Sequence, residues 1–215
     1  MTIVVDALNT PSIFAVESNK GFEAPRYQET SGRSYTMDNY EEQHPGRQTD
    51  TLEPIYREAG ITSLFDDLKK AGFNPTTEVL EYTVAPAGAE IASLLDCDDN
   101  DEVVHIKRLR FSRGVPLAIL HTTVLASKAP NQDGLTEAGL YSLLRDKGSI
   151  PASGSQLVGA RCAATEEAEL LQVSGGTAVL TVERTIYADN DEVIALEEDV
   201  YEASQYFLTF SLRAE

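Results

Sequence analysis

Two stretches of the chain, about 76 positions apart, carry the same pattern of residues. In each stretch a short helical segment that ends in two leucines precedes a turn and then a predicted β-hairpin. Without a gap, the shift aligns Leu94 with Leu170, Ile106 with Val182, Arg108 with Arg184, Phe111 with Tyr187, His121 with Glu197 and Val124 with Val200. Two such units predict an α+β fold, in which about six strands form one antiparallel sheet with helices against it. The alternative is a chance similarity between two helix–hairpin units.

The first of these hairpins, residues 102–126, carries an unusual pair of charges. Because side chains alternate along a strand, Arg108 and Arg110 share a face with Val104 and Ile106, at a spacing of about 6.5 Å. Guanidinium groups bind phosphate and carboxylate oxygens through paired hydrogen bonds, so this face favours a small anionic ligand. The alternative is an exposed strand face on which the two arginines pair with acidic side chains of the chain itself.

The charge balance of the whole chain argues against nucleic acid as a direct partner. The chain has 215 residues and a formal net charge of −18, with 17 Lys and Arg against 35 Asp and Glu. Nucleic-acid binding requires a positive footprint that neutralises phosphates, and no basic stripe is present. No apolar run reaches the roughly 18 residues of a membrane span, and no secretory signal pattern opens the chain. We therefore expect a cytoplasmic protein without a membrane contact, in which Cys97 and Cys162 are reduced thiols.

The chain divides into an arm and a body. Residues 1–58 are mostly polar and lack helical or strand periodicity, which predicts an irregular N-terminal arm. Only Thr2–Leu8 and Ser12–Val16 are compatible with short strands there. Residues 59–215 form the body.

The body alternates between predicted helices and strands. Helices are expected around Leu64–Leu68 with a stop at Gly72, at Ala87–Leu95, at Thr136–Lys147 and at Thr165–Val173, the last two with their threonine as N-cap. Strands are expected at Thr76–Val84, in the hairpin 102–126, and at Ser155–Ala163, Thr177–Tyr187, Glu192–Glu202 and Tyr206–Leu212.

Few other residues suggest chemistry. His121 lies in an apolar strand row, where a lone histidine is typical of the core or its rim. Glu197 and Asp199 share a strand face and are suited either to ligand hydroxyls and amines or to neutralising the hairpin arginines. The three histidines have no metal-ligand spacing, and no nucleophile-elbow or nucleotide-binding motif is present. The residues predict no catalytic role, no metal and no cofactor.

The order of the landmarks resembles a known family. These are VLEYTVAP, IKRLRFSRGVPLAI, GLYSLL, TEEAELLQVSGGTAVLTVERT, DEVIALEEDVY and QYFLTF, within about residues 60–215. They are similar to the UTRA domain, the effector-binding domain of the HutC branch of GntR transcriptional regulators, which shares the chorismate lyase fold. The most specific part is the combination of RxR-x-x-x-G-x-P with LL-x-V-x-x-G-x-x-x-L-x-V-x-R.

The resemblance implies a sensor rather than an enzyme. A member of this family is expected to bind a small anionic metabolite, such as a sugar phosphate, an amino acid or an organic acid. It is also expected to form a homodimer whose geometry regulates transcription. The candidate ligand-binding residues are Arg108, Arg110, Tyr141, Glu197 and Tyr206, together with His121 of the first hairpin.

The chain departs from the family pattern at several positions. Leu120 stands where sugar-phosphate sensors commonly have Glu, Gly139 stands in place of a serine, and the segment Tyr201–Tyr206 lacks the usual Arg and Asp. These changes imply a ligand with fewer hydroxyls than a sugar phosphate. Residues 1–58, with 5 basic and 10 acidic side chains, show no winged helix-turn-helix. We expect that domain to be missing or replaced, so that DNA is bound only if this or another chain supplies a DNA-binding domain.

Two alternative functions are compatible with the sequence. One is an enzyme of the chorismate lyase type, because a fold does not determine a function. The other is a regulatory protein whose N-terminal arm binds a partner, without direct contact to DNA.

Overall fold

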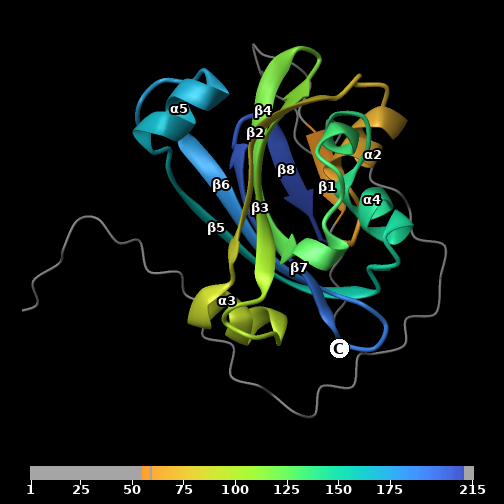
Figure 1. Cartoon of the computed structure of the whole chain (residues 1–215). Helices are drawn as coiled ribbons and strands as arrows, with labels where there is room; N and C mark the ends of the chain where they lie inside the picture. Colours follow the sequence, from red (N-terminus) through yellow and green to blue (C-terminus); the bar gives the residue numbers. More distant parts are fainter. Residues whose placement is uncertain (1–54, 59, 211–215) are drawn as a thin grey trace, which may run out of the picture. The chain divides into compact units, whose positions relative to one another are not determined.

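The two repeated units build one antiparallel sheet. The computed structural model describes residues 55–58 and 60–210. The first unit contains α2 (Leu64–Lys70), β2 (Thr76–Pro86), α3 (Gly88–Leu95), β3 (Glu102–Ser112) and β4 (Val115–Leu125). The second contains α4 (Leu140–Asp146), β5 (Ser153–Cys162), α5 (Thr165–Leu171), β6 (Ala178–Tyr187) and β7 (Val193–Glu202). The strands pair antiparallel in the order β2-β3-β4-β7-β6-β5, which confirms the predicted α+β fold (Figure 1).

The structure supports the internal repeat and corrects its alignment by one residue. Helices α2 and α4 begin at residues 64 and 140, and strands β3 and β6 at 102 and 178, so each pair of starts differs by 76. Both hairpins contain a bulge, which leaves Leu117 and Ile194 without a paired residue. These bulges are 77 positions apart, because five residues separate the paired Tyr187 and Val193, whereas four separate the paired Phe111 and Pro116. Leu120, rather than His121, therefore corresponds to Glu197.

The tight turn of the first hairpin explains that shorter connection. Arg113 and Gly114 form the two central positions, with φ of 53° and 80°. Two successive positive φ values are typical of a type I′ turn, whose twist matches that of the strands, and glycine is favoured at its second position.

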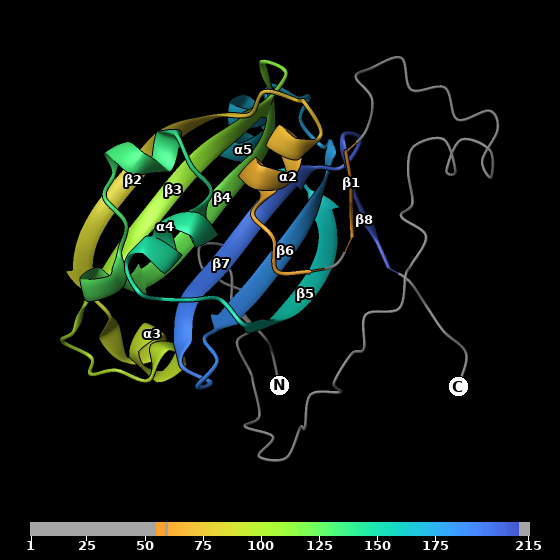
Figure 2. The ribbon, with the colours of Figure 1, turned by 90° about the vertical axis from the view of Figure 1, so that its right-hand side faces the viewer.

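Four helices cover the two faces of the sheet. Figure 2 shows α2 and α4 on one side, here named the front face, and α3 and α5 on the other, the back face. Core clusters agree with this layering, since Leu140 and Leu144 of α4 pack with Ile106, whereas Leu171 of α5 packs with Leu109. Alternation along β3 sends these two strand residues to opposite faces. No helix among the described residues is long and apolar enough to cross a membrane.

Helix α4 begins later than the sequence predicts. Residues Asp133–Thr136 form a 3₁₀ helix, η2, in which the Thr136 hydroxyl donates to the Asp133 carbonyl at 2.9 Å. Thr136 is therefore not an N-cap, and that prediction is wrong. The N-cap is Gly139, where a Cβ atom would lie only 2.2 Å from Ser63 Oγ. Glycine thus lets the starts of α2 and α4 approach each other over the front face.

A small second sheet joins the ends of the body. β1 (Ile55–Glu58) pairs parallel with β8 (Tyr206–Thr209), with Ile55 opposite Tyr206. Residues 55–58, which the sequence places in the arm, are thus part of the body's structure. The rest of the arm, including its two predicted short strands, and positions 211–212 of the last predicted strand lie outside the described residues. A 3₁₀ helix, η1 (Ala126–Lys128), follows β4.

Candidate ligand-binding site

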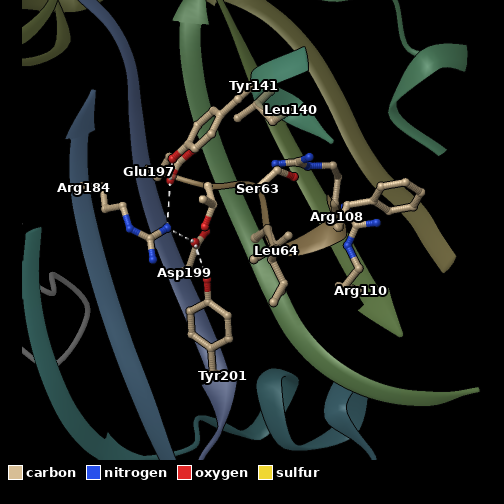
Figure 3. A pocket seen from close by; sticks show the side chains of 13 residues that line it. Ser63, Leu64, Arg108, Arg110, Leu140, Tyr141, Arg184, Glu197, Asp199 and Tyr201 are labelled. Atoms are coloured by element: carbon tan, nitrogen blue, oxygen red, sulfur yellow. Dashed lines mark hydrogen bonds and ion pairs between the residues drawn. The ribbon is translucent and has the colours of Figure 1, made fainter. Parts of the chain in front are cut away.

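Three successive rows of front-face residues supply the floor of a pocket, which is formed by Arg108, Arg110, Leu120, Arg184, Glu197, Asp199 and Tyr201. Reading across β3, β4, β7 and β6, the rows are Ile106–Thr122–Glu197–Arg184, Arg108–Leu120–Asp199–Val182 and Arg110–Ala118–Tyr201–Leu180. The roof consists of residues 62–65, which lead into α2, and of Leu140 and Tyr141 at the start of α4. The volume that the centre of a water-sized molecule can occupy between these side chains is about 30 Å³, within about 330 Å³ of unfilled space that includes open water at the mouth. Figure 3 shows the arginines of β3 and the acidic residues of β7 on opposite sides of this space.

On one side of the pocket, the charged side chains pair with one another. Arg184 Nη1 lies 3.1 Å from Glu197 Oε2 and 3.2 Å from Asp199 Oδ2, and Arg184 Nε donates to Gln156 at 2.6 Å. The hydroxyl of Tyr141 donates to Glu197 at 3.0 Å, and that of Tyr201 donates to Asp199 at 2.9 Å. The charge of Arg184 is thereby neutralised inside the protein.

Both carboxylates of this network are buried, and their environment disfavours a double negative charge. Burial, followed by the neighbouring Glu197, raises the pKa of Asp199 to about 7. Arg184, the Tyr201 hydroxyl and Arg108 act in the opposite direction. Asp199 therefore changes its charge near neutral pH.

The other side of the pocket holds two buried cations. Arg108 and Arg110 are 3% and 1% exposed. Arg108 Nη2 donates to Thr122 at 3.1 Å, whereas Arg110 donates to Thr77 and places its guanidinium carbon 4.8 Å from the centre of the Phe65 ring. Among the described residues neither arginine forms an ion pair, and the Nε atoms of both are buried without a hydrogen-bond partner.

Burial without a counter-ion is unfavourable for both guanidinium groups. Burial lowers the pKa of Arg108, and burial together with the adjacent Arg108 lowers the pKa of Arg110 to about 9. With three arginines and two carboxylates, the pocket has one excess positive charge when both acids are ionised and two when Asp199 is protonated. An anion in the pocket would relieve this imbalance.

The pocket brings together four of the six residues predicted from the sequence. Arg108, Arg110, Tyr141 and Glu197 all line it. Tyr206 does not; its ring stacks on Tyr201, with centroids 4.0 Å apart and planes at 13°.

His121 lies on the back face of the sheet, where it is exposed and stands between Lys107 and Glu198 in the cross-strand pairing. The structure therefore does not bring His121 or Tyr206 to the pocket.

Sequence reasoning missed other lining residues. The sequence contained an indication that Arg184 lines the same site, because the repeat aligns it with Arg108. The roof residues Thr62 and Ser63 had none as ligand contacts, since they belong to the short connection before α2, and Phe65 was predicted only as part of that helix.

The family comparison agrees with this architecture. The model of the UTRA domain matches residues 70–206. The chain belongs to the UTRA domain family. This match includes both arginines of β3 and the acidic residues of β7, and it begins within α2, so that most of the pocket roof lies before it.

Similar proteins carry regulatory names. This chain is 28% identical over 165 residues to the HTH-type transcriptional repressor NagR of Bacillus subtilis (strain 168), covering 75% of this chain and 68% of NagR. It is 28% identical over 167 residues to the histidine utilization repressor of Pseudomonas putida, covering 76% of this chain and 67% of that protein. The crystal structure of a putative transcriptional regulator from Streptomyces coelicolor is 36% identical, with a TM-score of 0.60 over 66% of this chain and 95% of that one.

These relatives confirm the resemblance to GntR regulators of the HutC type. They are named as transcriptional regulators rather than enzymes, which points to a regulatory role for this UTRA domain. Within the part of the chain that the structure describes, no group of three or more His, Cys, Asp or Glu side chains is placed to hold a metal ion.

Proposed function

We propose that this UTRA domain senses a small anionic metabolite, and that occupancy of the pocket changes the geometry of a homodimer to regulate transcription. The observation that carries the proposal is the pair of buried guanidinium groups on β3, which form no ion pair among the described residues. A phosphate or carboxylate group would accept hydrogen bonds from Arg108 and Arg110 and supply the missing negative charge.

The opposite side of the pocket would select the rest of the ligand. Glu197 and the Tyr141 hydroxyl are positioned for an amine or hydroxyl group of the ligand. Between them and the arginines, the floor is Leu120 and part of the roof is Leu140, both apolar. This surface favours an amino acid or organic acid over a heavily hydroxylated sugar phosphate. Tyr206 would act through its stack on Tyr201 and not through ligand contact.

Two routes connect the pocket to β1, and hence to the segment that precedes it. The roof residues 62–65 follow β1 by a few positions, so a ligand that touches the roof acts on that connection. In addition, Tyr201 lines the pocket and stacks on Tyr206, which starts β8, the partner of β1. A ligand that fits one arrangement of these parts better would shift the population toward it. DNA contact would require a DNA-binding domain from this or another chain.

The ligand assignment is tested by calorimetry. A thermal-shift screen of phosphorylated sugars, amino acids and organic acids would first identify a ligand, because binding at 100 times the dissociation constant stabilises by about 2.7 kcal/mol. Arg108→Ala and Arg110→Ala should then each weaken binding by about 1.5–3 kcal/mol, the range for hydrogen bonds to charged groups. Arg145→Ala, which removes an exposed arginine of α4, is the matched control. Unchanged affinity in both pocket variants would refute the assignment.

A further inference from the structure

A second cavity lies beside the ligand pocket. The volume that the centre of a water-sized molecule can occupy is about 410 Å³ there, compared with about 30 Å³ in the ligand pocket. Small-molecule sites of proteins typically measure about 300–1,000 Å³. Because one water needs about 10–15 Å³ by the same measure, the ligand pocket holds a group of the size of a carboxylate or part of a phosphate. The body of a larger ligand fits the second cavity instead.

The two cavities meet at Arg184, which lines both. Its Nη1 atom pairs with Glu197 and Asp199 of the ligand pocket, whereas its Nε atom donates at 2.6 Å to Gln156, which lines the second cavity. Gln156 lies opposite Arg184 in the ladder of β5 and β6, so the two cavities rest on the same face of the sheet. A single elongated molecule that lies across Arg184 would therefore enter both cavities.

The roof also continues from one cavity to the other. Residues 62–65 line the ligand pocket, and Gly60 and Ile61, directly before them, line the second cavity. Figure 2 shows this segment in orange, in front of β6, on its way to α2. A Cβ atom at Gly154 of β5 would lie 3.2 Å from Ile186 Cδ1 and 3.5 Å from Ile61 Cδ1, so glycine leaves the space between these two side chains open. One stretch of chain thus covers both cavities.

The second cavity is suited to an apolar, uncharged group. Ile61, Val158, Ile186 and Phe210 contribute its apolar side chains. Val158 and Phe210 are 38% and 57% exposed, and covering such apolar surface with an apolar group is favourable. Among the described residues, no Asp, Glu, Lys or His lines this cavity, and the charge of Arg184 is paired with two carboxylates. A charged group would therefore lose its hydration there without gaining a partner.

We infer that the ligand is an amphiphilic acid that occupies both cavities, with its carboxylate or phosphate at Arg108 and Arg110 and an apolar chain in the second cavity. The inference deepens the proposed function and rests on it. Between the two ends, Leu120 of the floor and Leu140 of the roof offer apolar contacts to the chain. Neighbouring strands are about 4.8 Å apart, so β3 and β6, with two strands between them, are about 14 Å apart. A chain of several methylene groups would span this distance.

Calorimetric titration of the full chain with a homologous series tests the inference. The series consists of the straight-chain carboxylates from butanoate to decanoate, with the uncharged 1-decanol for comparison. Once the chain passes Arg184, each further methylene should raise the affinity about four-fold, as expected for the burial of one methylene group. 1-Decanol, which brings no negative charge to the two arginines, should bind at least ~10-fold more weakly than decanoate.

Two substitutions in the second cavity separate the contribution of the chain from that of the acid group. Val158→Asp and Phe210→Asp, both at exposed positions, should abolish the gain with chain length and leave the affinity for butanoate unchanged. Leu157→Asp is the matched control and should retain the gain, because Leu157 is 60% exposed on the opposite face of β5. Arg108→Ala should weaken butanoate and decanoate by the same factor. Circular dichroism verifies that each variant is folded.

Three results would overturn the inference: no binding by any member of the series, an affinity that does not depend on chain length in the wild type, or a gain that survives both aspartate variants. 1-Decanol that binds as tightly as decanoate would also overturn it, because the second cavity would then be an apolar site independent of the arginines. The acid group tests the proposed function separately. Binding that depends on Arg108 but not on chain length refutes only the second cavity as part of the site. A gain with chain length in which Arg108→Ala weakens no member refutes the anion site of the proposed function as well.

Discussion

Replacing Arg110 by methionine should stabilise the ligand-free domain and weaken its affinity for an anion. Arg110 is almost completely buried, and in the described part of the chain it contacts Thr77 and the Phe65 ring but no carboxylate. A buried charge without a counter-ion disfavours the folded state. Methionine retains most of the apolar packing of the side chain and removes the charge.

The size of the effect follows from the pKa of Arg110, which is lowered from 12.5 to about 9. Each step of one on the pKa scale corresponds to 1.36 kcal/mol, so the charged form is disfavoured by about 5 kcal/mol on folding. Loss of the cation–π contact with Phe65 and of the hydrogen bond to Thr77 offsets about 2–3 kcal/mol of this. We expect a net gain of about 2–3 kcal/mol, or about 5–10 °C in Tm for a domain of this size.

Urea unfolding of Arg110→Met and of the wild type, with and without ligand, measures both parts of the prediction. The advantage of the variant should be complete at pH 7 and should shrink above about pH 9, because the wild-type guanidinium then loses its proton in the folded state. Arg145→Met, at an exposed position of α4, should change stability by less than about 0.5 kcal/mol. A pocket variant less stable than the wild type would show that the charge of Arg110 is already compensated, and the reasoning would fail.

Two further predictions concern the acidic side and the floor of the pocket. The affinity for a carboxylate ligand should fall as the pH rises through about 7, because Asp199 then gains its negative charge. The loss should be about 1–2 kcal/mol for charges about 10 Å apart at an effective dielectric constant of ~20, and a pH titration of Asp199→Asn should be flat. Leu120→Glu places a carboxylate opposite Arg108 and should lower anion affinity at least ~10-fold by calorimetry. An undiminished affinity in that variant would mean that Arg108 does not hold the anion.

Much of the fold could be predicted because its signals are local. Strand alternation placed Arg108 and Arg110 on one face, and the repeat predicted two matching halves. The ion-pair partners of the carboxylates were harder to predict from the sequence, since strand alternation alone allowed Glu197 to neutralise any of the hairpin arginines. Strand order decides the partner: β6 lies next to β7 and puts Arg184 directly opposite Glu197, whereas β3 is two strands away.

The roof of the pocket could not be predicted for a different reason. Thr62 and Ser63 carry no ligand-binding motif. Their position depends on the approach of α2 to α4, two helices that are far apart in the sequence. That approach requires glycine at position 139, because a Cβ atom there would clash with Ser63. The start of α4 was misplaced because the Thr136 hydroxyl bonds backward to Asp133, a choice that a capping pattern does not reveal.

The two halves of the repeat differ in a way that explains why the proposed anion contacts lie on β3 and not on β6. Arg184 has Glu197 opposite and Asp199 diagonally across, and it pairs with both. At the corresponding places around Arg108 stand Leu120, opposite it, and Thr122, which accepts its hydrogen bond. One half of the repeat therefore contains its own counter-ions, whereas the equivalent positions of the other half hold an apolar and a neutral side chain. The same strand geometry stabilises the fold in the first case and leaves an unneutralised cation in the second, so a bound anion would take the place that two carboxylates occupy around Arg184.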